Sequence, residues 1–304
     1  MSEEKKEKIA SIVVTFNRKD MLLKCINAIL NETKKVDHIF VVDNNSTDGT
    51  KELMTDNFGG NNLITYIRLG ENIGSSGGFN KAVQLAYEWG ADWIWFLDDD
   101  VMPRPDCLEI LLKYQHISKC IHPNKVDIYN NEFMWESVFD PAIGRATFLN
   151  NISFKNGKDF TFLNMGCFEG MLIHREIVEK IGYPDKRFFI CSDDTIYGFV
   201  ASLYTNVIFI KDAVLDKQVA FSNITTPVFL YYYIRNQFIV KEYLKKYKFY
   251  NKYLFNLNFF IFVCSACTKH TIRSKKLLTP FYVFKGVFDG IRGKFFKLNW
   301  SLWK

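Results

Sequence analysis

Hydrophobic and polar positions alternate along the first hundred residues in blocks that predict strands and helices in turn. Apolar runs of strand length, rich in β-branched or aromatic residues, cover residues 9–15, 38–42, 63–69 and 93–97. Between the first two runs, apolar residues recur at helical spacing after Asp20, which suits a helix cap. These are Leu22, Leu23, Ile26, Ile29 and Leu30. A strand–helix–strand start predicts an α/β fold with a parallel sheet.

A polar segment follows each predicted strand. Residues 16–18 follow the first strand and residues 43–50 the second. After the third comes a glycine-rich segment, residues 71–80, which leads into a helix predicted over residues 81–89. Such a loop can offer backbone amides to phosphate, although its spacing is not the dinucleotide fingerprint. Because ligands of open α/β sheets bind at the carboxyl ends of strands, we expect a ligand site here.

The fourth predicted strand ends in three consecutive carboxylates, Asp98, Asp99 and Asp100. Three like charges packed together repel one another and raise their pKa values, so a hard cation with oxygen ligands would stabilise them. A solvated acidic turn is the alternative, and it is the commoner one for three acids alone. The buried strand that precedes them favours a metal site.

Composition and cysteine usage indicate a globular intracellular protein. A chain of 304 residues with 48% hydrophobic composition can fill a large core and carry an appendage. The seven cysteines are scattered, and the CxxC spacing of Cys264 and Cys267 lacks a second pair for zinc. The charged start has no apolar signal region behind it, and no apolar run reaches bilayer length. We therefore expect reduced thiols and a cytoplasmic location.

The net charge of +6 is concentrated toward the C-terminus. From Lys241 onward, lysine and arginine alternate with tyrosine, phenylalanine and tryptophan. This pattern suits a region that lies on the inner face of a membrane. The alternative is a helical appendage that packs on the rest of the chain or contacts a second copy in a homo-oligomer. No nucleic-acid motif accompanies the basic residues, so we expect no nucleic-acid partner.

Four motifs in order resemble the inverting family 2 glycosyltransferases of the GT-A fold, especially the branch with bacterial rhamnosyltransferases and galactofuranosyltransferases. The motifs are Thr15–Arg18, Asp43–Gly49, Asn72–Gly74 with Gly77 and Gly78, and Leu97–Asp100. The resemblance covers roughly residues 8–240. It implies a Rossmann-like mixed sheet flanked by helices, with a catalytic domain over residues 1–240 and a helical, basic and aromatic region over residues 241–304.

The resemblance also implies a UDP- or dTDP-linked sugar as donor. Residues assigned to this donor are Thr15, Phe16, Asn17, Arg18, Asp43, Asn45, Asn72, Gly74, Gly77, Asp98, Asp99 and Arg235. Asp43 would contact the base edge, although a turn-capping role is a competing interpretation. Arg235 would hold the diphosphate, although stacking within an aromatic helix would explain it equally well.

The metal and the catalytic base follow from the same resemblance. Asp98 and Asp100 would hold Mn²⁺ or Mg²⁺, which stabilises the leaving diphosphate. Asp216 would be a third metal ligand, where relatives carry a histidine. Asp194 would remove the proton of the acceptor hydroxyl, with Asp193 as its neighbour, because a carboxylate beside another in a partly apolar pocket has a raised pKa. Capping of the following helix is the alternative role of this pair.

The sequence thus predicts a metal-dependent, inverting hexosyltransferase. It would transfer galactofuranose, slightly favoured, or rhamnose to a hydroxyl of a cell-surface glycan or a lipid-linked oligosaccharide. A non-catalytic nucleotide-sugar- or glycan-binding relative is a second reading, because the metal-site histidine and a tryptophan that relatives carry near Phe168 are absent. A nucleotidyltransferase is a third, but its usual basic glycine-rich loop after the first strand is absent.

Overall fold

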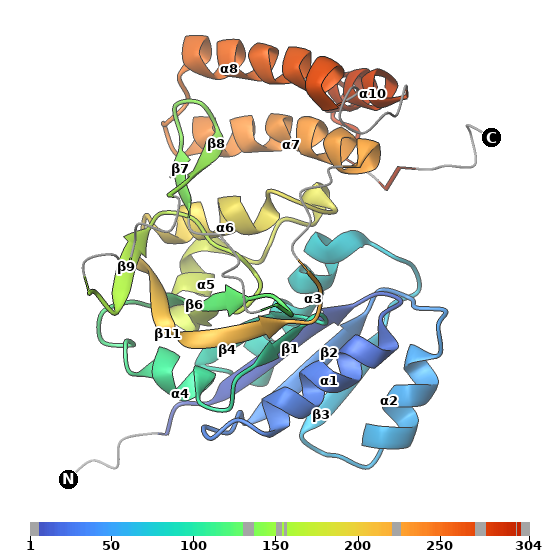
Figure 1. The fold of residues 1–304 in the computed structure, drawn as a ribbon, viewed down its shortest axis with the longest axis vertical. Coiled ribbons are helices and arrows are strands. Elements are labelled where there is room, and N and C mark those ends of the chain that lie inside the picture. Colours follow the sequence, from blue (N-terminus) through green and yellow to red (C-terminus); the bar gives the residue numbers. More distant parts are fainter. Residues whose placement is uncertain are drawn as a thin grey trace.

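The computed structural model describes residues 6–129, 137–149, 154, 157–220, 226–270, 278–295 and 297–298. A nine-stranded sheet crosses the middle of this part of the molecule (Figure 1). Its order is β3-β2-β1-β4-β10-β6-β11-β5, and β9 pairs with the far side of β11. The strands are β1 Ile9–Thr15, β2 His38–Asp43, β3 Ile64–Arg68, β4 Trp93–Asp98, β5 Val101–Pro103, β6 Cys120–Val126, β9 Phe160–Leu163, β10 Leu172–His174 and β11 Val207–Lys217.

The four strands predicted from the sequence form the parallel half of the sheet. β3, β2, β1 and β4 are all parallel neighbours, whereas β10 runs antiparallel to β4 and makes the sheet mixed. Alternate residues of β1 face opposite layers, because side chains alternate along a strand. Ile12 packs in the layer of α3, Gly74–Trp89, and Val13 packs in the layer of α1, Lys19–Leu30. Helix α2, Thr50–Phe58, also flanks this half, whereas α4, Cys107–Leu112, contacts β6 and β11, and α5, Arg175–Ile181, contacts β10.

Helix α3, Gly74–Trp89, begins seven residues earlier than predicted, so the glycines belong to a helix and not to a loop. Their function is close packing. A Cβ on Gly78 would lie 2.6 Å from Val14 Cγ1, and a Cβ on Gly74 would lie 2.1 Å from the Phe189 carbonyl oxygen. Glycine at these positions lets the helix approach both β1 and the segment before the helix Asp193–Ala201.

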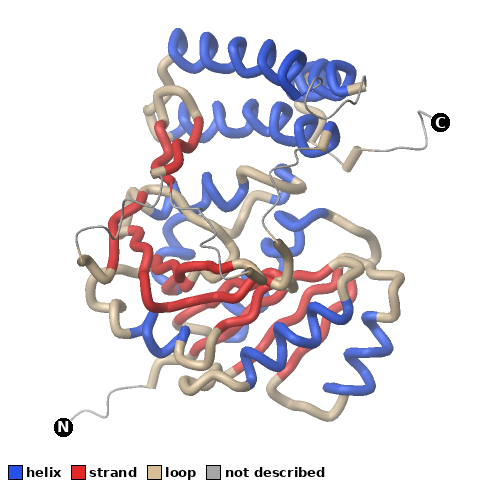
Figure 2. Tube along the Cα trace, viewed as in Figure 1, coloured by secondary structure: helices blue, strands red, loops and turns tan. Residues whose placement is uncertain are grey.

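The C-terminal helices form layers on the side of the sheet away from α1 and α2 (Figures 1 and 2). They are α6 Asp193–Ala201, α7 Pro227–Lys246, α8 Lys252–Ser265, η2 Ala266–His270 and α10 Thr279–Ile291. A hairpin of β7, Ser137–Asp140, and β8, Arg145–Phe148, stands beside α7. Residue 240, the predicted domain boundary, falls inside α7, so the two-part division remains a prediction. Among the residues described, no helix has the length and apolarity needed to cross a membrane.

Candidate active site

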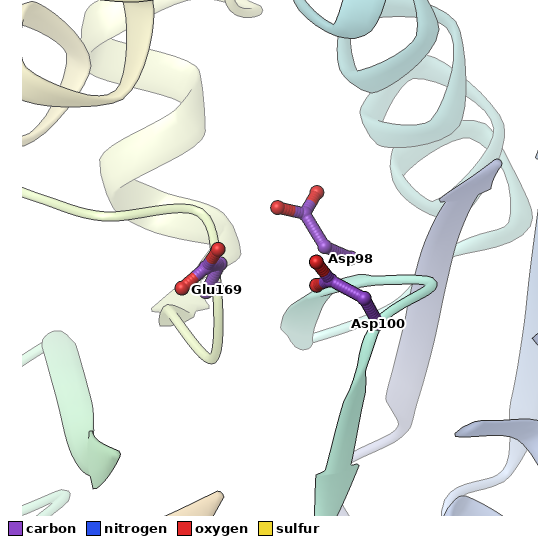
Figure 3. Close-up of side chains that lie close together, drawn as sticks. All are labelled: Asp98, Asp100 and Glu169. Atoms are coloured by element: carbon purple, nitrogen blue, oxygen red, sulfur yellow. The ribbon is translucent and has the colours of Figure 1, made fainter. Parts of the chain in front are cut away.

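Three carboxylates meet at the carboxyl end of the central strand β4. Oxygen atoms of Asp98, Asp100 and Glu169 all lie within 4.8 Å of one another (Figure 3). We call these three residues the acid cluster. Asp98 ends β4, and Glu169 lies shortly before β10, which pairs with β4. The sequence predicted Asp98 and Asp100, but it gave Glu169 no role, because only the pairing of β10 with β4 brings Glu169 to this edge.

Two buried lysines also reach the acid cluster, and neither was predicted. Lys217 Nζ donates to Asp100 Oδ1 at 2.9 Å and to Glu169 Oε1 at 2.6 Å. Lys125 Nζ donates to Glu169 Oε2 at 2.7 Å. Burial alone would raise the pKa of Glu169, but the two ammonium groups lower it to about 2. By contrast, burial together with the Glu169 and Asp100 charges raises the pKa of Asp98 well above its usual value.

The predicted role of Asp216 as a metal ligand requires correction. Asp216 pairs with Arg104, 2.9 Å away, and is about a third exposed. Because successive side chains of a strand point to opposite faces, Lys217 and not Asp216 faces the acid cluster from β11. The burial of Leu215, two residues before Lys217, follows the same alternation. That alternation was the signal in the sequence that could have identified the inward-facing residue.

The acid cluster offers a donor set that fits a divalent cation. Mn²⁺ and Mg²⁺ prefer carboxylate oxygens, and three such groups within mutual reach can serve one ion. Asp98, Asp100 and Glu169 are therefore the residues that would hold it.

The loop after β1 lies against the acids. The Thr15 hydroxyl donates to Asp99 at 2.7 Å, and Arg18 Nη1 lies 3.1 Å from carboxylate oxygens of both Asp99 and Asp100. Burial raises the pKa of Asp99, although Arg18 and Thr15 oppose this effect. Asp99 thus fixes the loop. Phe16 is 42% exposed and the Arg18 side chain 47% exposed, so these two can still contact a ligand.

Asp43 is fully buried, which contradicts the expected contact with a base. Its carboxylate accepts hydrogen bonds from the Tyr66 hydroxyl at 2.6 Å and from the Ser46 backbone amide at 2.8 Å. The Asp43 carboxylate is thus enclosed by protein groups. The competing interpretation, a turn residue, describes Asp43 in this structure.

The asparagines of these loops bind backbone groups. Asn17 Oδ1 accepts from the Thr47 amide, Asn45 Nδ2 donates to the Gly70 carbonyl, and Asn72 Oδ1 accepts from the Gly74 amide. These bonds shape the rim of the site. Gly77 lies inside α3, where an added Cβ would come within 2.7 Å of Ile73, so it lines no phosphate-binding loop.

The second pair of acids begins helix α6. Asp193 is buried and accepts from the Ser76 hydroxyl of α3 at 2.7 Å. Asp194 Oδ1 accepts from the Thr195 amide at 2.6 Å. Burial, followed by the charge of Asp193, raises the pKa of Asp194 to about 7. A carboxyl group with that pKa can accept a proton near neutral pH.

Arg235 holds the loop before α6 and does not reach the acid cluster through any described contact. It is fully buried in α7, donates to the Phe188 carbonyl at 2.6 Å, and stacks on Tyr232 with 4.8 Å between the guanidinium carbon and the ring centre. Its neighbour Asn236 donates to the Ile190 and Cys191 carbonyls. The structure therefore corrects the expected contact between Arg235 and the diphosphate. Arg235 positions the loop before α6.

That loop is strained. Phe189, Cys191 and Ser192 all have φ between 62° and 66°, a region that residues with side chains seldom adopt. Such conformations persist only where the surroundings enforce them, and they gather at functional sites. Arg235 and Asn236 supply that enforcement directly before Asp193 and Asp194.

A cleft of about 670 Å³ joins the two groups of acids. Asp98 and Glu169 line it from the sheet, and Asp193 and Asp194 line it from α6. Aromatic side chains of α3, α7 and the β7–β8 hairpin complete its wall; they include Phe79, Phe139, Phe148, Phe229 and Tyr233. The cleft therefore presents two groups of carboxylates to one ligand.

The family profile described as Glycosyl transferase family 2 matches residues 11–182, which is more than half of the chain. The chain belongs to glycosyl transferase family 2. This is the family that the sequence motifs predicted. The matched range contains β1–β4, the acid cluster and the glycine-rich start of α3, and it ends before Asp193 and Asp194.

The curated relatives include a galactofuranosyltransferase and a rhamnosyl transferase, the two kinds of enzyme that the motifs indicated. A galactofuranosyltransferase, GlfT1 of Mycolicibacterium smegmatis, is 28% identical over 193 residues, which cover 62% of this chain and 63% of the relative. The chain thus matches somewhat less than two thirds of that relative's length. The dTDP-rhamnosyl transferase RfbF of Shigella flexneri is 25% identical over 244 residues, covering 76% of this chain and 79% of the relative.

Solved structures share the GT-A fold. The mannosyltransferase PcManGT from Pyrobaculum calidifontis, in complex with GDP-Man and Mn²⁺, aligns with a TM-score of 0.60 and 15% identity. The alignment covers 96% of this chain and 89% of the other. GalNAc-T7 with UDP, GalNAc and Mn²⁺ gives the same TM-score at 12% identity, over 79% of this chain and 48% of that one.

Proposed function

We propose that the protein transfers a sugar, with inversion, from a nucleotide diphosphate donor to an acceptor hydroxyl in the cleft. The observation that carries the proposal is that Asp98 of the acid cluster and Asp194 line the same cleft. The acids at the end of β4 would hold a cation that faces the anionic diphosphate of the donor. Asp194 lies across the cleft, where an acceptor hydroxyl would approach.

In this reaction Asp194 removes the hydroxyl proton as the acceptor oxygen attacks the anomeric carbon. The bond from that carbon to the diphosphate oxygen breaks, and the electron pair leaves with the diphosphate. The pKa of about 7 keeps Asp194 partly ionised at neutral pH and basic enough to accept a proton. Asp193, bonded to Ser76, supplies the neighbouring charge that supports this pKa.

Asp98, Asp100 and Glu169 would hold Mn²⁺ or Mg²⁺. When bound, the ion supplies positive charge that stabilises the leaving diphosphate. Arg18 is the exposed cation beside these acids and would contact donor phosphate, and the exposed ring of Phe16 would stack on the nucleobase.

The favoured donors are UDP-galactofuranose and then dTDP-rhamnose, with a cell-surface or lipid-linked glycan as acceptor. The relatives named above support this choice. The test has two stages. Thermal stabilisation by UDP, dTDP, GDP and CDP, each with Mn²⁺, Mg²⁺ or EDTA, identifies the nucleotide, because a ligand that binds only the folded state raises its stability. Transfer from the matching sugar donor is then measured with wild type and Asp194→Asn.

A metal-dependent shift with UDP and transfer of galactofuranose would support the first choice, and a preference for dTDP would favour rhamnose. Nucleotide binding without hydrolysis or transfer would favour a non-catalytic nucleotide-sugar-binding protein. No stabilisation by any nucleotide would contradict the proposed donor site.

We also propose that α8 and α10 rest on the inner face of a membrane, where a lipid-linked acceptor would be presented. Large apolar side chains are exposed along both helices: Tyr253, Leu254, Leu257, Phe260 and Ile261 on α8, and Phe281, Phe284, Phe288 and Ile291 on α10. Exposed Lys252, Arg292 and Lys294 stand at the ends of the two helices. Apolar surface combined with positive charge suits an anionic lipid surface.

A further inference from the structure

The position of Lys217 at the acid cluster has a consequence for cation binding. The lysine side chain is only 4% exposed, and its ammonium lies between Asp100 and Glu169. Its backbone is fixed as well, because β11 pairs with β5 at Lys217 and Val101, and the next amide, of Gln218, donates to the Asp100 carbonyl at 2.8 Å. The ammonium is therefore held at this place by the sheet.

Every carboxylate oxygen of Asp100 and Glu169 already faces a cationic side chain. Lys217 donates to Oδ1 of Asp100 and to Oε1 of Glu169. Arg18 donates to Oδ2 of Asp100, and Lys125 donates to Oε2 of Glu169. Lys217 is the one that bridges the two acids. A divalent ion would need the same oxygens at about 2.0–2.2 Å, and an ammonium at hydrogen-bond distance would repel it.

We propose that Lys217 is a built-in counter-ion that competes with the divalent cation for Asp100 and Glu169, so that the ion binds weakly unless Lys217 is displaced. This inference rests on the assignment of the acid cluster as the cation site of the proposed transferase. It adds that the chain carries its own positive charge at that site. That charge lies on β11, the strand of Asp216, which the sequence predicted as the third metal ligand.

The test measures binding of Mn²⁺ alone, by electron paramagnetic resonance of the free ion, to wild type, K217M, K217R and K211M. Lys217→Met removes the competing charge, and we expect it to bind Mn²⁺ at least about tenfold more tightly, a difference of about 1.4 kcal/mol. Lys217→Arg keeps the charge and should stay near wild type. Lys211 lies exposed on the same strand, so Lys211→Met controls for the loss of one positive charge elsewhere.

Equal or weaker Mn²⁺ affinity of K217M, or no Mn²⁺ binding to any of the four proteins, would overturn the inference. If K217M does not fold, the test uses wild type alone. Its lysines are reductively methylated, and mass spectrometry measures the methylation of Lys217. Displacement by Mg²⁺ should raise the reactivity of Lys217, and unchanged reactivity at saturating Mg²⁺ would contradict competition. Neither readout requires sugar transfer, so a failure of the proposed function would be seen separately.

Discussion

The proton affinity of Asp194 depends on its immediate surroundings. The carboxyl group is buried next to Asp193, and both influences favour its neutral form. The base must be ionised to act. Hence kcat/KM for transfer should rise with pH up to about 7 and fall about tenfold per unit below it, which a pH–rate profile will measure.

Asp194→Asn should reduce kcat by roughly 10²–10⁴-fold and abolish this limb of the profile. Asp216→Asn is the matched control, because Asp216 is paired with Arg104 outside the acid cluster. Near-normal activity of Asp216→Asn would agree with its corrected position. An Asp194→Asn enzyme that kept the wild-type rate and profile would rule out Asp194 as the base.

Glu32 is a buried carboxyl group that does not line the cleft. Burial raises its pKa to about 8, and it accepts from the Leu108 amide at 3.2 Å. The folded protein thus binds a proton that the unfolded chain releases near pH 4.3, so stability falls as pH rises from about 4.5 to 8. The free energy of unfolding of wild type should fall between pH 5.5 and 8. In Glu32→Gln this fall should be smaller by about 1–3 kcal/mol.

Urea unfolding at the two pH values measures this difference. Glu52→Gln, at an exposed glutamate of α2, is the charge-matched control. Parallel pH dependence of wild type and Glu32→Gln would contradict the buried, protonated state of Glu32.

At the scale of elements, helix α6 is seated against the loop that carries Glu169. A Cβ on Gly198 would lie 1.9 Å from the Gly166 nitrogen and 2.3 Å from its Cα. These are backbone atoms, which cannot move aside without shifting the loop. The contact therefore helps to set the separation between Asp194 and the acid cluster.

Gly198→Ala should destabilise the protein by about 1–3 kcal/mol through overpacking and should lower kcat, because it pushes the base away from the donor side. Calorimetric melting and steady-state kinetics measure the two effects. Gly60→Ala is the control, since no atom lies within 4 Å of its added Cβ. A Gly198→Ala protein as stable and active as wild type would show that this close packing is dispensable.

At the scale of the whole molecule, α10 packs closely on α7 through glycine contacts. A Cβ on Gly290 would lie 2.2 Å from Phe238 of α7, and Asp289 accepts from the buried Tyr231 hydroxyl at 2.8 Å. The inner side of α10 thus packs against α7. Its outer side carries exposed apolar residues, which leaves that side available to a membrane surface.

The double variant Leu257→Ser, Phe284→Ser should reduce sedimentation with vesicles that contain anionic phospholipid by at least about fivefold, because it removes two exposed anchors of about 2 kcal/mol each. Its melting temperature should stay within 2–4 °C of wild type, as exposed substitutions cost little. Tyr204→Ser, at an exposed tyrosine just after α6, is the control.

Two outcomes would contradict the membrane proposal. Unchanged vesicle binding by the double variant would place any lipid contact elsewhere. The homo-oligomer interpretation would be favoured if wild type did not bind vesicles but sedimented as a dimer, and if the double variant disrupted that dimer.

The sequence by itself determined the family and the parallel half of the sheet, and it predicted most of the acids that line the cleft. Strands β1 to β4 were predicted from local apolar runs. Asp98, Asp100 and the Asp193–Asp194 pair were predicted from motifs that occur in a particular order along the chain. These features are local, because a strand's hydrophobic run and the polar residues at its end are neighbours in the chain.

The tertiary structure alone decided which side chains share the cleft. Glu169, Lys125 and Lys217 converge because β6, β10 and β11 join the sheet out of sequence order. The same pairing turns Asp216 outward, and the packing of α7 against the loop before α6 makes Arg235 a positioning residue. Strand register and helix packing arise from contacts between distant segments, so no single stretch of sequence contains them.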